Sequence, residues 1–362
     1  MDVIRCFALF TIAANHFYSY SGYLTQPMDG PVMYGMTLLH QVFLVTIPVF
    51  LMLSGYLMKN KKPTRSYYAK LVDTLGIYLL ASLCCMIYHT LSYTLQGRTP
   101  MSLPFQIIGI FSYTTVPYGW YINMYIGLFL LIPFLNVLYN NLESQRSKQY
   151  LILSLLCLST VPNLLNIFRF DSLAWWIQPS SVGSYHHLFP DWWYDSYPLT
   201  YYFLGAYLRE YPLKMKPSRH ILLILVCSFL FGSFQFYRSY PGPYVTGVWQ
   251  DWGSPFLGLQ AVLYFNLFAT LDYSRLSPKL CRIFAAVSKL TLGAYLVSSI
   301  FDEAFYGILT DAIPEVTARF PWCTVTVPAI LICSLALSAV INLIYDMLRS
   351  MVLRLTRAKI SS

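Results

Sequence analysis

The chain has 362 residues, of which 57% are hydrophobic and only 11% are charged, and its mean hydropathy is +0.52. A soluble domain carries about 25% charged residues, so this composition excludes an ordinary water-exposed surface and indicates an integral membrane protein. The formal charge of +9 does not make nucleic acid an expected partner, because the basic residues form short clusters between apolar runs and no nucleic-acid-binding motif. The partner expected from this apolar composition is the lipid bilayer.

Apolar runs long enough to cross a membrane recur along the whole chain. A hydrocarbon core of about 30 Å requires about 20 apolar residues in a helix. The sequence therefore predicts an all-α, polytopic transmembrane bundle of about ten spans, which forms one domain over residues 1–362 with no soluble accessory domain. Long loops are expected only near 94–118 and 169–193. The predicted spans lie near residues 2–22, 36–58, 71–93, 119–140, 149–168, 194–210, 219–238, 253–271, 285–309 and 323–348.

The basic residues predict the orientation of these spans. If the N-terminus is cytoplasmic, 20 of the 24 basic residues, Arg357 and Lys359 among them, lie in the inner segments. The outer segments receive only Arg98, Arg169, Arg238 and Arg319. We therefore expect both termini to be cytoplasmic and the protein to be a multi-pass component of the cell (cytoplasmic) membrane.

The first apolar run has an alternative to a membrane span. A signal peptide would account for the stretch from Cys6 to Ala14, but the stretch continues through Phe17 and Tyr18 without a small-x-small cleavage site. The predicted orientation also requires that this span be retained. A start upstream of the first residue stays open, because Arg5 is close to the beginning for a span that starts in water.

Ionisable side chains inside a bilayer are costly, so those of the first span are functional candidates. Asp2, Arg5, Asn15 and His16 share this span. Arg5 and His16 are eleven residues apart, which places them about 20° apart on one helix face and roughly 16 Å apart in height. Asp2 is close enough to hold the Arg5 guanidinium. Histidine is the natural general base near neutral pH, and a hydrogen-bonded packing role is the alternative for His16.

Other candidates for chemistry are weaker. His40 and His89 each stand alone in an apolar run, where a hydrogen-bonded core or interfacial histidine is the expected role. The eight cysteines include no C-x-x-C pair and no zinc spacing, so we expect no metal site and interpret them as small apolar packing residues.

A bulky apolar run from Pro48 to Leu57 contains Ser54, Gly55 and Tyr56 just before a basic cluster. The small pair at 54 and 55 would let another helix backbone approach closely. We expect a structural role for these three residues, with a direct catalytic role for Ser54 as the alternative.

Asp2-x-x-Arg5 followed by His16, and then the Pro48 to Leu57 run, resembles the acyltransferase-3 family of integral membrane acyltransferases. The segment Gly119-Trp120-Tyr121 is similar to the family's Leu-Trp-Phe segment. Gly293-Ala294-Tyr295-Leu296 is similar to its Gly-x-Tyr-Leu segment. These motifs, in this order and spacing, cover most of the chain.

The sequence departs from the family pattern at three places. Many members have His-Leu-Trp where this chain has Tyr118-Gly119-Trp120, and a histidine after Tyr-Leu where this chain has Val297-Ser298-Ser299. The common pair of arginines after the second span is reduced to Arg65 and Lys70, with Asp73 where a basic residue often stands.

The resemblance implies transfer of an acyl group, usually acetyl from acetyl-CoA, to a hydroxyl of a sugar or lipid-linked glycan. By position, His16 matches the family's essential histidine and Arg5 its partnering arginine. Neutral His16 would remove the proton of the acceptor hydroxyl as its oxygen attacks the thioester carbonyl. Arg5 would stabilise the oxyanion or hold the donor. Acyl-CoA would be a donor substrate, and no tightly bound cofactor is expected.

Two further groups are candidate substrate contacts. A basic cluster would bind the phosphates of CoA, unless it serves only as the positive-inside signal; its members are Lys59, Lys61, Lys62 and Arg65. Sugar contacts are expected from aromatic faces, which stack on C–H surfaces, and from carboxylates, which accept hydroxyl hydrogen bonds. The outer-loop aromatic residues could instead anchor helices at the membrane interface. The candidate sugar contacts are Trp120, Trp192, Trp193, Asp302 and Glu303.

A membrane transporter or exporter of a glycan or small solute is the alternative function, because Asp302, Glu303, His16 and His40 would also suit a solute pathway. The sequence contains no inverted repeat of the kind typical of transporters. A sensor or structural role gives no reason for Arg5 to share a face with His16. If the protein modifies a surface glycan, polysaccharide assembly proteins are expected partners.

Overall fold

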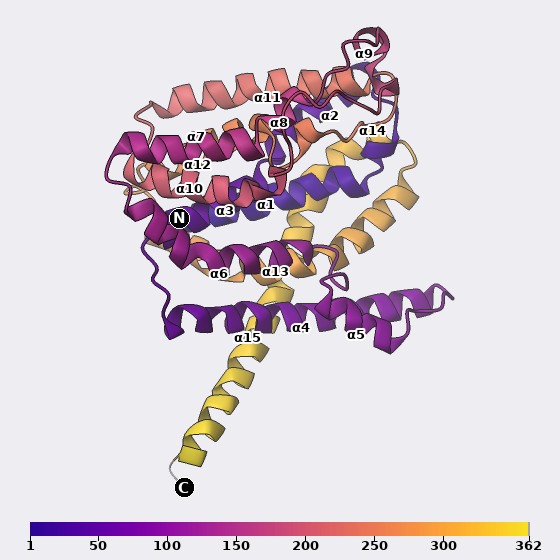
Figure 1. Ribbon diagram of the computed structural model, residues 1–362. Helices are drawn as coiled ribbons and strands as arrows, with labels where there is room; N and C mark the ends of the chain where they lie inside the picture. The colour runs from indigo at the N-terminus through magenta and orange to yellow at the C-terminus, as the bar shows by residue number, and fades with distance from the viewer. Residues whose placement is uncertain (361–362) are drawn as a thin grey trace.

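The computed structural model describes the backbone of residues 1–360 and the side chains of residues 1–355. Residues 361 and 362, and the side chains of Arg357 and Lys359 used in the charge count, lie outside this description. All regular secondary structure within residues 1–360 is helical, and no strand occurs there (Figure 1). The predicted all-α class is confirmed.

The helices differ greatly in length. The long ones are α1 (Asp2–Tyr20), α2 (Gly30–Phe43), α3 (Thr46–Met58), α4 (Arg65–Leu95), α5 (Leu103–Phe111), α6 (Trp120–Asn140), α7 (Gln145–Ser159), α10 (Tyr197–Glu210), α11 (Pro217–Ser239), α12 (Pro255–Thr270), α13 (Pro278–Ala312) and α15 (Cys323–Ile360). Short turns of helix lie in the connections: η1 (Tyr23–Thr25), α8 (Pro162–Leu165), α9 (Ala174–Ile177), η2 (Pro179–Ser181), η3 (Tyr194–Ser196), η4 (Val248–Gln250), α14 (Val316–Arg319) and η5 (Phe320–Trp322).

Each predicted span overlaps at least one of the long helices. Within the described residues, six helical segments are long and apolar enough to cross a membrane, namely α2 with α3, α4, α6, α11, α13 and residues 316–355. A multi-pass membrane protein is therefore confirmed. The prediction of about ten complete crossings is not confirmed, because α7, α10 and α12 have only 15, 14 and 16 residues. A full crossing needs about 20.

The second predicted span is divided into two helices, which the sequence analysis did not anticipate. Leu44 and Val45 separate α2 from α3. Pro48 lies in the first turn of α3 and has no N–H to donate to the carbonyl of Leu44, so a continuous helix would lose a hydrogen bond here. The hydroxyls of Thr46 and Thr11 lie 2.8 Å apart and fix the break against α1.

The connection near 94–118 is not wholly a loop, as the sequence analysis expected, because it contains α5. Phe105, Ile108 and Phe111 of this helix are 65%, 58% and 79% exposed. An outward apolar face of this kind suits contact with lipid. α15 also continues past the predicted end near 348, to Ile360, and its C-terminal part extends beyond the bundle (Figure 1).

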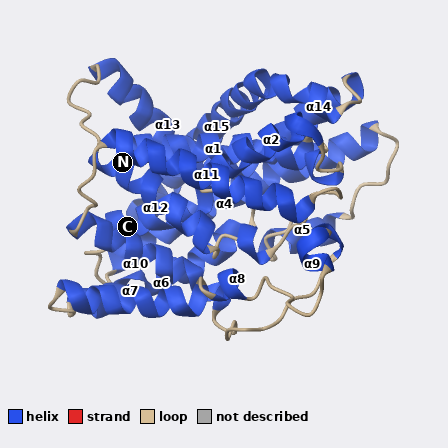
Figure 2. Cartoon of the chain, turned by 90° about the horizontal axis from the view of Figure 1, so that it is seen from above, coloured by secondary structure: helices blue, strands red, loops and turns tan. Residues whose placement is uncertain are grey.

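α1 lies inside the bundle, where it packs against α3, α13 and α15 (Figures 1 and 2). Ile4, Ala8 and Phe17 on α1 are completely or almost completely buried. Burial on several sides explains how a helix with Asp2, Arg5 and His16 can be accommodated, since its polar residues contact protein or cavities rather than lipid.

α3 and α10 cross in close contact. A Cβ atom on Gly55 would stand 1.8 Å from the Tyr202 carbonyl oxygen, and one on Gly205 would stand 1.8 Å from the Met52 carbonyl oxygen. These distances lie far inside van der Waals contact. Only glycine allows the two backbones to meet here.

The segments predicted to be cytoplasmic gather at one end of the bundle. Glu210, at the end of α10, forms ion pairs with Lys59 after α3 and with Lys148 in α7. At the opposite end, where the predicted outer segments meet, Arg319 donates to the carbonyl oxygen of Ser21. Predicted inner and outer connections therefore lie at opposite ends of the bundle, as expected for consecutive spans. Which end faces the cytoplasm stays a prediction from the charge distribution.

Candidate active site

His16, near the C-terminal end of α1, is joined to a carboxylate and a tyrosine. Its Nδ1–H donates to Oδ2 of Asp302 in α13 across 2.8 Å, and the hydroxyl of Tyr118 donates to the same oxygen across 2.7 Å. The rings of His16 and Tyr118 stack with centroids 4.2 Å apart. Because a carboxylate only accepts hydrogen bonds, this arrangement assigns the proton to Nδ1. The lone pair is left on Nε2, which has no hydrogen-bond partner among the described side chains.

Asp302 is completely buried, with 0% of its surface exposed. Its Oδ1 atom has no hydrogen-bond partner among the described residues. An unsatisfied buried polar group costs about 1–3 kcal/mol, and more when it is charged. A side chain retained at this cost is better explained by chemistry than by stability. Asp302 is predicted from the sequence to contact sugar, and in the structure its carboxylate contacts His16.

His16 opens on a cavity of about 360 Å³, which we call the histidine cavity. Trp120 and Trp252 form part of its wall and stack on each other with centroids 4.3 Å apart and planes 10° apart. Leu44 and Thr46, at the break between α2 and α3, form another part. The broken helix therefore shapes the space in front of the imidazole.

A larger cavity of about 500 Å³, which we call the basic cavity, adjoins the histidine cavity. The two share Ile12, Ile47 and Tyr295 as lining residues. Ile12 lies on α1 between Arg5 and His16, so the two cavities follow one another along the face of α1 that carries both residues. Together they line this face of α1 from Arg5 to His16.

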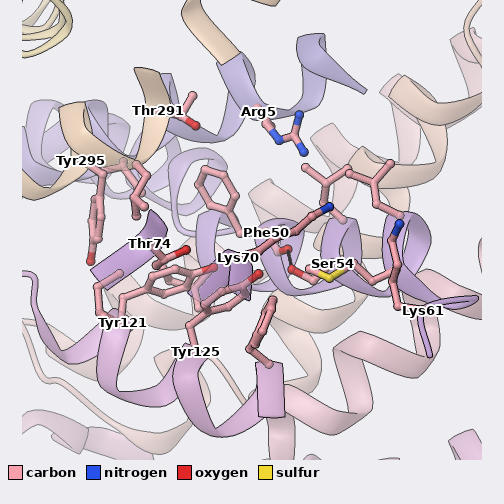
Figure 3. A pocket seen from close by; sticks show the side chains of 18 of the residues that line it. Arg5, Phe50, Ser54, Lys61, Lys70, Thr74, Tyr121, Tyr125, Thr291 and Tyr295 are labelled. Carbon is pink, nitrogen blue, oxygen red and sulfur yellow. Dashed lines mark hydrogen bonds between the residues drawn. The ribbon is translucent and has the colours of Figure 1, made fainter. Parts of the chain in front are cut away.

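The charged residues of the basic cavity come from three elements. Arg5 belongs to α1, Lys61 to the connection after α3, and Lys70 to α4. In Figure 3 the ends of these three side chains lie toward one side of the cavity, and Tyr121 and Tyr295 lie toward the other. The basic cavity is therefore cationic at one side and aromatic at the other.

Arg5 is held at the edge of this cavity by two neighbours. Its Nη1 donates to Asp2 Oδ1 across 3.3 Å and to Ser288 Oγ across 3.1 Å. Ser288 in turn donates to Asp2 across 2.8 Å. The guanidinium is thus oriented through one nitrogen, and its other donors face no partner among the described side chains.

The structure separates the predicted phosphate-binding cluster. Lys61 lines the basic cavity, but Lys59, Lys62 and Arg65 do not. Lys59 is buried in its ion pair with Glu210. A lysine held in a buried pair is costly to withdraw, so it is a poor candidate for binding a mobile phosphate. Lys62 and Arg65 are exposed next to the cavity residues in sequence, and their role stays a prediction.

Three predicted sugar contacts lie outside the walls of the two cavities. Trp192 and Trp193 are 91% and 62% exposed and line neither the histidine cavity nor the basic cavity. Glu303 lies 3.6 Å from His89 of α4 and also lines neither cavity. Their substrate-binding role stays a prediction. Trp120 is the aromatic candidate that lines the histidine cavity.

The remaining candidates have local partners. Ser54 lines the basic cavity, but its hydroxyl donates to the Phe50 carbonyl within α3, 3.1 Å away, and no described histidine contacts it. Tyr56 lies beneath the Arg209 guanidinium, 5.7 Å from the ring centroid. His40 is buried and bonds Asn15 across 2.8 Å. None of these contacts forms an activated nucleophile.

Tyr118, Tyr295 and Trp252 lie at the site but are not predicted as site residues from the sequence. Tyr118 stands where many family members have histidine, and that departure was a signal for it. Tyr295 belongs to the Gly-x-Tyr-Leu segment; its hydroxyl donates to the Tyr118 carbonyl across 3.2 Å. Trp252 had no sequence signal, because it reaches Trp120 only through the fold.

The comparison with known families identifies the family of the chain. The acyltransferase-3 family, described as an acyltransferase domain, matches residues 1–340. No curated protein and no solved structure matches the chain. The family match confirms the resemblance seen in the motifs and favours the acyltransferase interpretation over the transporter alternative. The chain therefore belongs to the acyltransferase-3 family and is a membrane acyltransferase.

Proposed function

We propose that the protein transfers an acyl group, with acetyl as the first candidate, from acyl-CoA to a hydroxyl of a cell-surface or lipid-linked sugar. His16 acts as the general base. The observation that carries this proposal is that the two cavities adjoin at Ile12, Ile47 and Tyr295, so that a cavity with three cationic side chains lies next to an imidazole with a free Nε2.

The basic cavity suits the donor. Arg5, Lys61 and Lys70 would bind phosphate groups of CoA, because guanidinium and ammonium groups are the usual phosphate ligands of proteins. The distance along α1 from Arg5 to His16 is about 16 Å, which an extended pantetheine arm can bridge. The thioester would then lie where the two cavities adjoin.

The proposed reaction uses the tautomer assigned above. Nε2 of His16 removes the proton of the sugar hydroxyl while that oxygen attacks the thioester carbonyl carbon. The tetrahedral oxyanion collapses, the C–S bond breaks, and the leaving thiolate takes the proton back from the imidazolium. Asp302 stabilises the imidazolium during the reaction and keeps the ring oriented. No covalent acyl-enzyme is needed.

The predicted orientation gives the two substrates different entrances. Arg5 lies near the end of α1 that is predicted to be cytoplasmic, and His16 lies toward the other end. Acyl-CoA would enter from the cytoplasm, and the sugar would reach the histidine cavity from outside, against Trp120 and Trp252. Polysaccharide assembly proteins would supply such an acceptor.

Replacement of His16 by glutamine tests the proposal. The glutamine side chain keeps much of the size and polarity of histidine but cannot take up a proton near neutral pH, so transfer should fall to background. The measurement is acetate released by mild alkali from purified glycan of cells that contain matched amounts of each protein. His89→Gln is the control, because His89 also faces a carboxylate of α13 but lines neither cavity. Normal acetylation with His16→Gln would show that His16 is not the base.

A further inference from the structure

A third cavity of about 420 Å³, which we call the outer cavity, lies among the predicted outer segments. It is formed by residues 163–194 and by the connection at 248–251. Its size is within the range of ligand pockets in proteins. Its wall is fixed in place in part by Tyr185, whose hydroxyl accepts a hydrogen bond of 2.9 Å from the completely buried Arg238.

Asn163 gives the outer cavity a buried donor. The residue is 4% exposed and lines the cavity, and its Nδ2 atom has no hydrogen-bond partner among the described residues. An unmet buried amide costs about 1–3 kcal/mol. A ligand oxygen in the cavity would remove this cost once the Asn163 side chain turns its covered amide toward it.

Carboxylates supply acceptors on the same wall. Asp251 accepts a hydrogen bond from the Tyr194 hydroxyl across 3.3 Å, and Asp191 lies 3.0 Å from His187. Burial raises the pKa of the Asp251 carboxyl above its ordinary value. No lysine or arginine lines the cavity, and the described residues contain no cluster able to hold a metal ion. His186 and His187 also line the cavity, but each is paired with an aspartate, so the set of donors and acceptors matches neutral hydroxyl groups better than an anion.

The outer cavity is linked to the histidine cavity through two consecutive residues. Asp251 lines the outer cavity and Trp252 lines the histidine cavity. The Trp252 carbonyl accepts a hydrogen bond of 2.5 Å from Tyr201, which fixes this segment between them. A ligand that fills both spaces must therefore extend past the Asp251–Trp252 backbone.

We propose that the outer cavity is a second sugar subsite, which binds a neighbouring unit of the acceptor while another unit presents its hydroxyl to His16. Asn163 donates to this remote unit, and Asp251 accepts from it. The inference rests on the proposed function and adds to it that the acceptor is a glycan of at least two sugar units. A remote unit bound here lowers KM for the longer acceptor and leaves the chemistry at His16 unchanged.

The test uses the purified protein in lipid nanodiscs, acetyl-CoA, and the surface glycan of the source cells after partial acid hydrolysis and separation by size. Transfer is measured to the monosaccharide fraction and to the fraction of two to six units. Wild-type protein should show a KM at least tenfold lower, per reducing end, for the longer fraction. Asn163→Leu should remove this advantage and leave transfer to monosaccharide unchanged.

Two further variants, Asp251→Asn and Gln178→Leu, test whether the effect is specific to the outer cavity. Asn163→Leu replaces an amide with no protein partner by an apolar group of similar size, so the fold is not expected to weaken. Asp251→Asn changes the acceptor side independently and should also reduce the advantage of the longer fraction. Gln178→Leu, the same kind of change at an exposed site of the outer region that does not line the cavity, should keep it.

The outcomes separate the two proposals. If wild-type protein acetylates both fractions but Asn163→Leu and Asp251→Asn keep the full advantage of the longer one, the outer subsite is wrong and the proposed function stands. Equal KM values for both fractions in wild-type protein lead to the same conclusion. If wild-type protein transfers acetyl to no sugar fraction, both proposals are wrong.

Discussion

The contact between His16 and Asp302 leads to a quantitative prediction for Asp302→Asn. Asparagine has the shape of aspartate but no charge. If its oxygen faces His16, the proton stays on Nδ1 and the imidazolium formed during the reaction loses its counter-charge. If its NH2 group faces His16, that group must donate to Nδ1, and the proton moves to Nε2. The ring then presents a donor to the acceptor hydroxyl and cannot act as a base.

Both orientations imply a large loss of rate. With a charge separation of roughly 4 Å and an effective dielectric constant of about 20, loss of the carboxylate charge removes about 4 kcal/mol of stabilisation. This corresponds to about 10³-fold in kcat. The tautomer change would cost about 10⁴-fold, as in Ser-His-Asp enzymes. We expect kcat to fall by about 10³- to 10⁴-fold, and KM for acyl-CoA to change little because Asp302 does not line the basic cavity.

The assay is acetyl transfer from acetyl-CoA to purified glycan by wild-type and variant protein in nanodiscs, with kcat and KM determined for both substrates. Asp302 carries an unsatisfied Oδ1, so removal of its charge should not lower the thermal unfolding temperature. Asp311→Asn is the matched control, because it is the same substitution on an exposed position of α13. A loss of kcat smaller than tenfold, in folded Asp302→Asn protein, would refute the assigned role of Asp302.

Three other predictions concern the donor, the fold and the orientation. Arg5→Lys keeps the positive charge but loses the planar guanidinium group, so KM for acyl-CoA should rise about tenfold. An unchanged KM would show that Arg5 does not bind the donor. Gly55→Ala places a Cβ atom 1.8 Å from the Tyr202 carbonyl oxygen, so it should destabilise the protein by about 3 kcal/mol or more, seen as a lower unfolding temperature in detergent. A C-terminal tag should be protected in intact cells, whereas a cysteine at Trp192 should react with an impermeant reagent; an accessible C-terminus would contradict the predicted orientation.

The sequence was sufficient for the class, the family and the central catalytic candidate. Low charge and long apolar runs exclude a soluble domain, because a bilayer core admits few charged groups. Helical periodicity alone places Arg5 and His16 on one face of α1, and in the structure they line two adjoining cavities. The apolar runs and the shared face of Arg5 and His16 are both properties of single segments. Such properties can be inferred from composition and residue spacing.

Interactions between distant segments could not be inferred in this way. Asp302 stands 286 residues from His16, and nothing in its own apolar run indicates that it faces the imidazole rather than a sugar. The separation of Lys59 from Lys61 was equally hidden, because it depends on Glu210 at the end of another helix. The side-chain partners of a buried charge are set by how the helices pack against each other.

The sequence by itself therefore determined the local features of this protein: its apolar helices, the basic segments that connect them, and a histidine and an arginine on one helix face. Only the tertiary structure decided what those residues contact, where the helix broken before Pro48 opens a cavity, and how Trp252 comes to stack on Trp120. The physical reason is that periodicity is a property of one helix, whereas a site is made of atoms from several. Their distances are fixed by close packing and by hydrogen bonds between buried groups, which act only after the helices have come together.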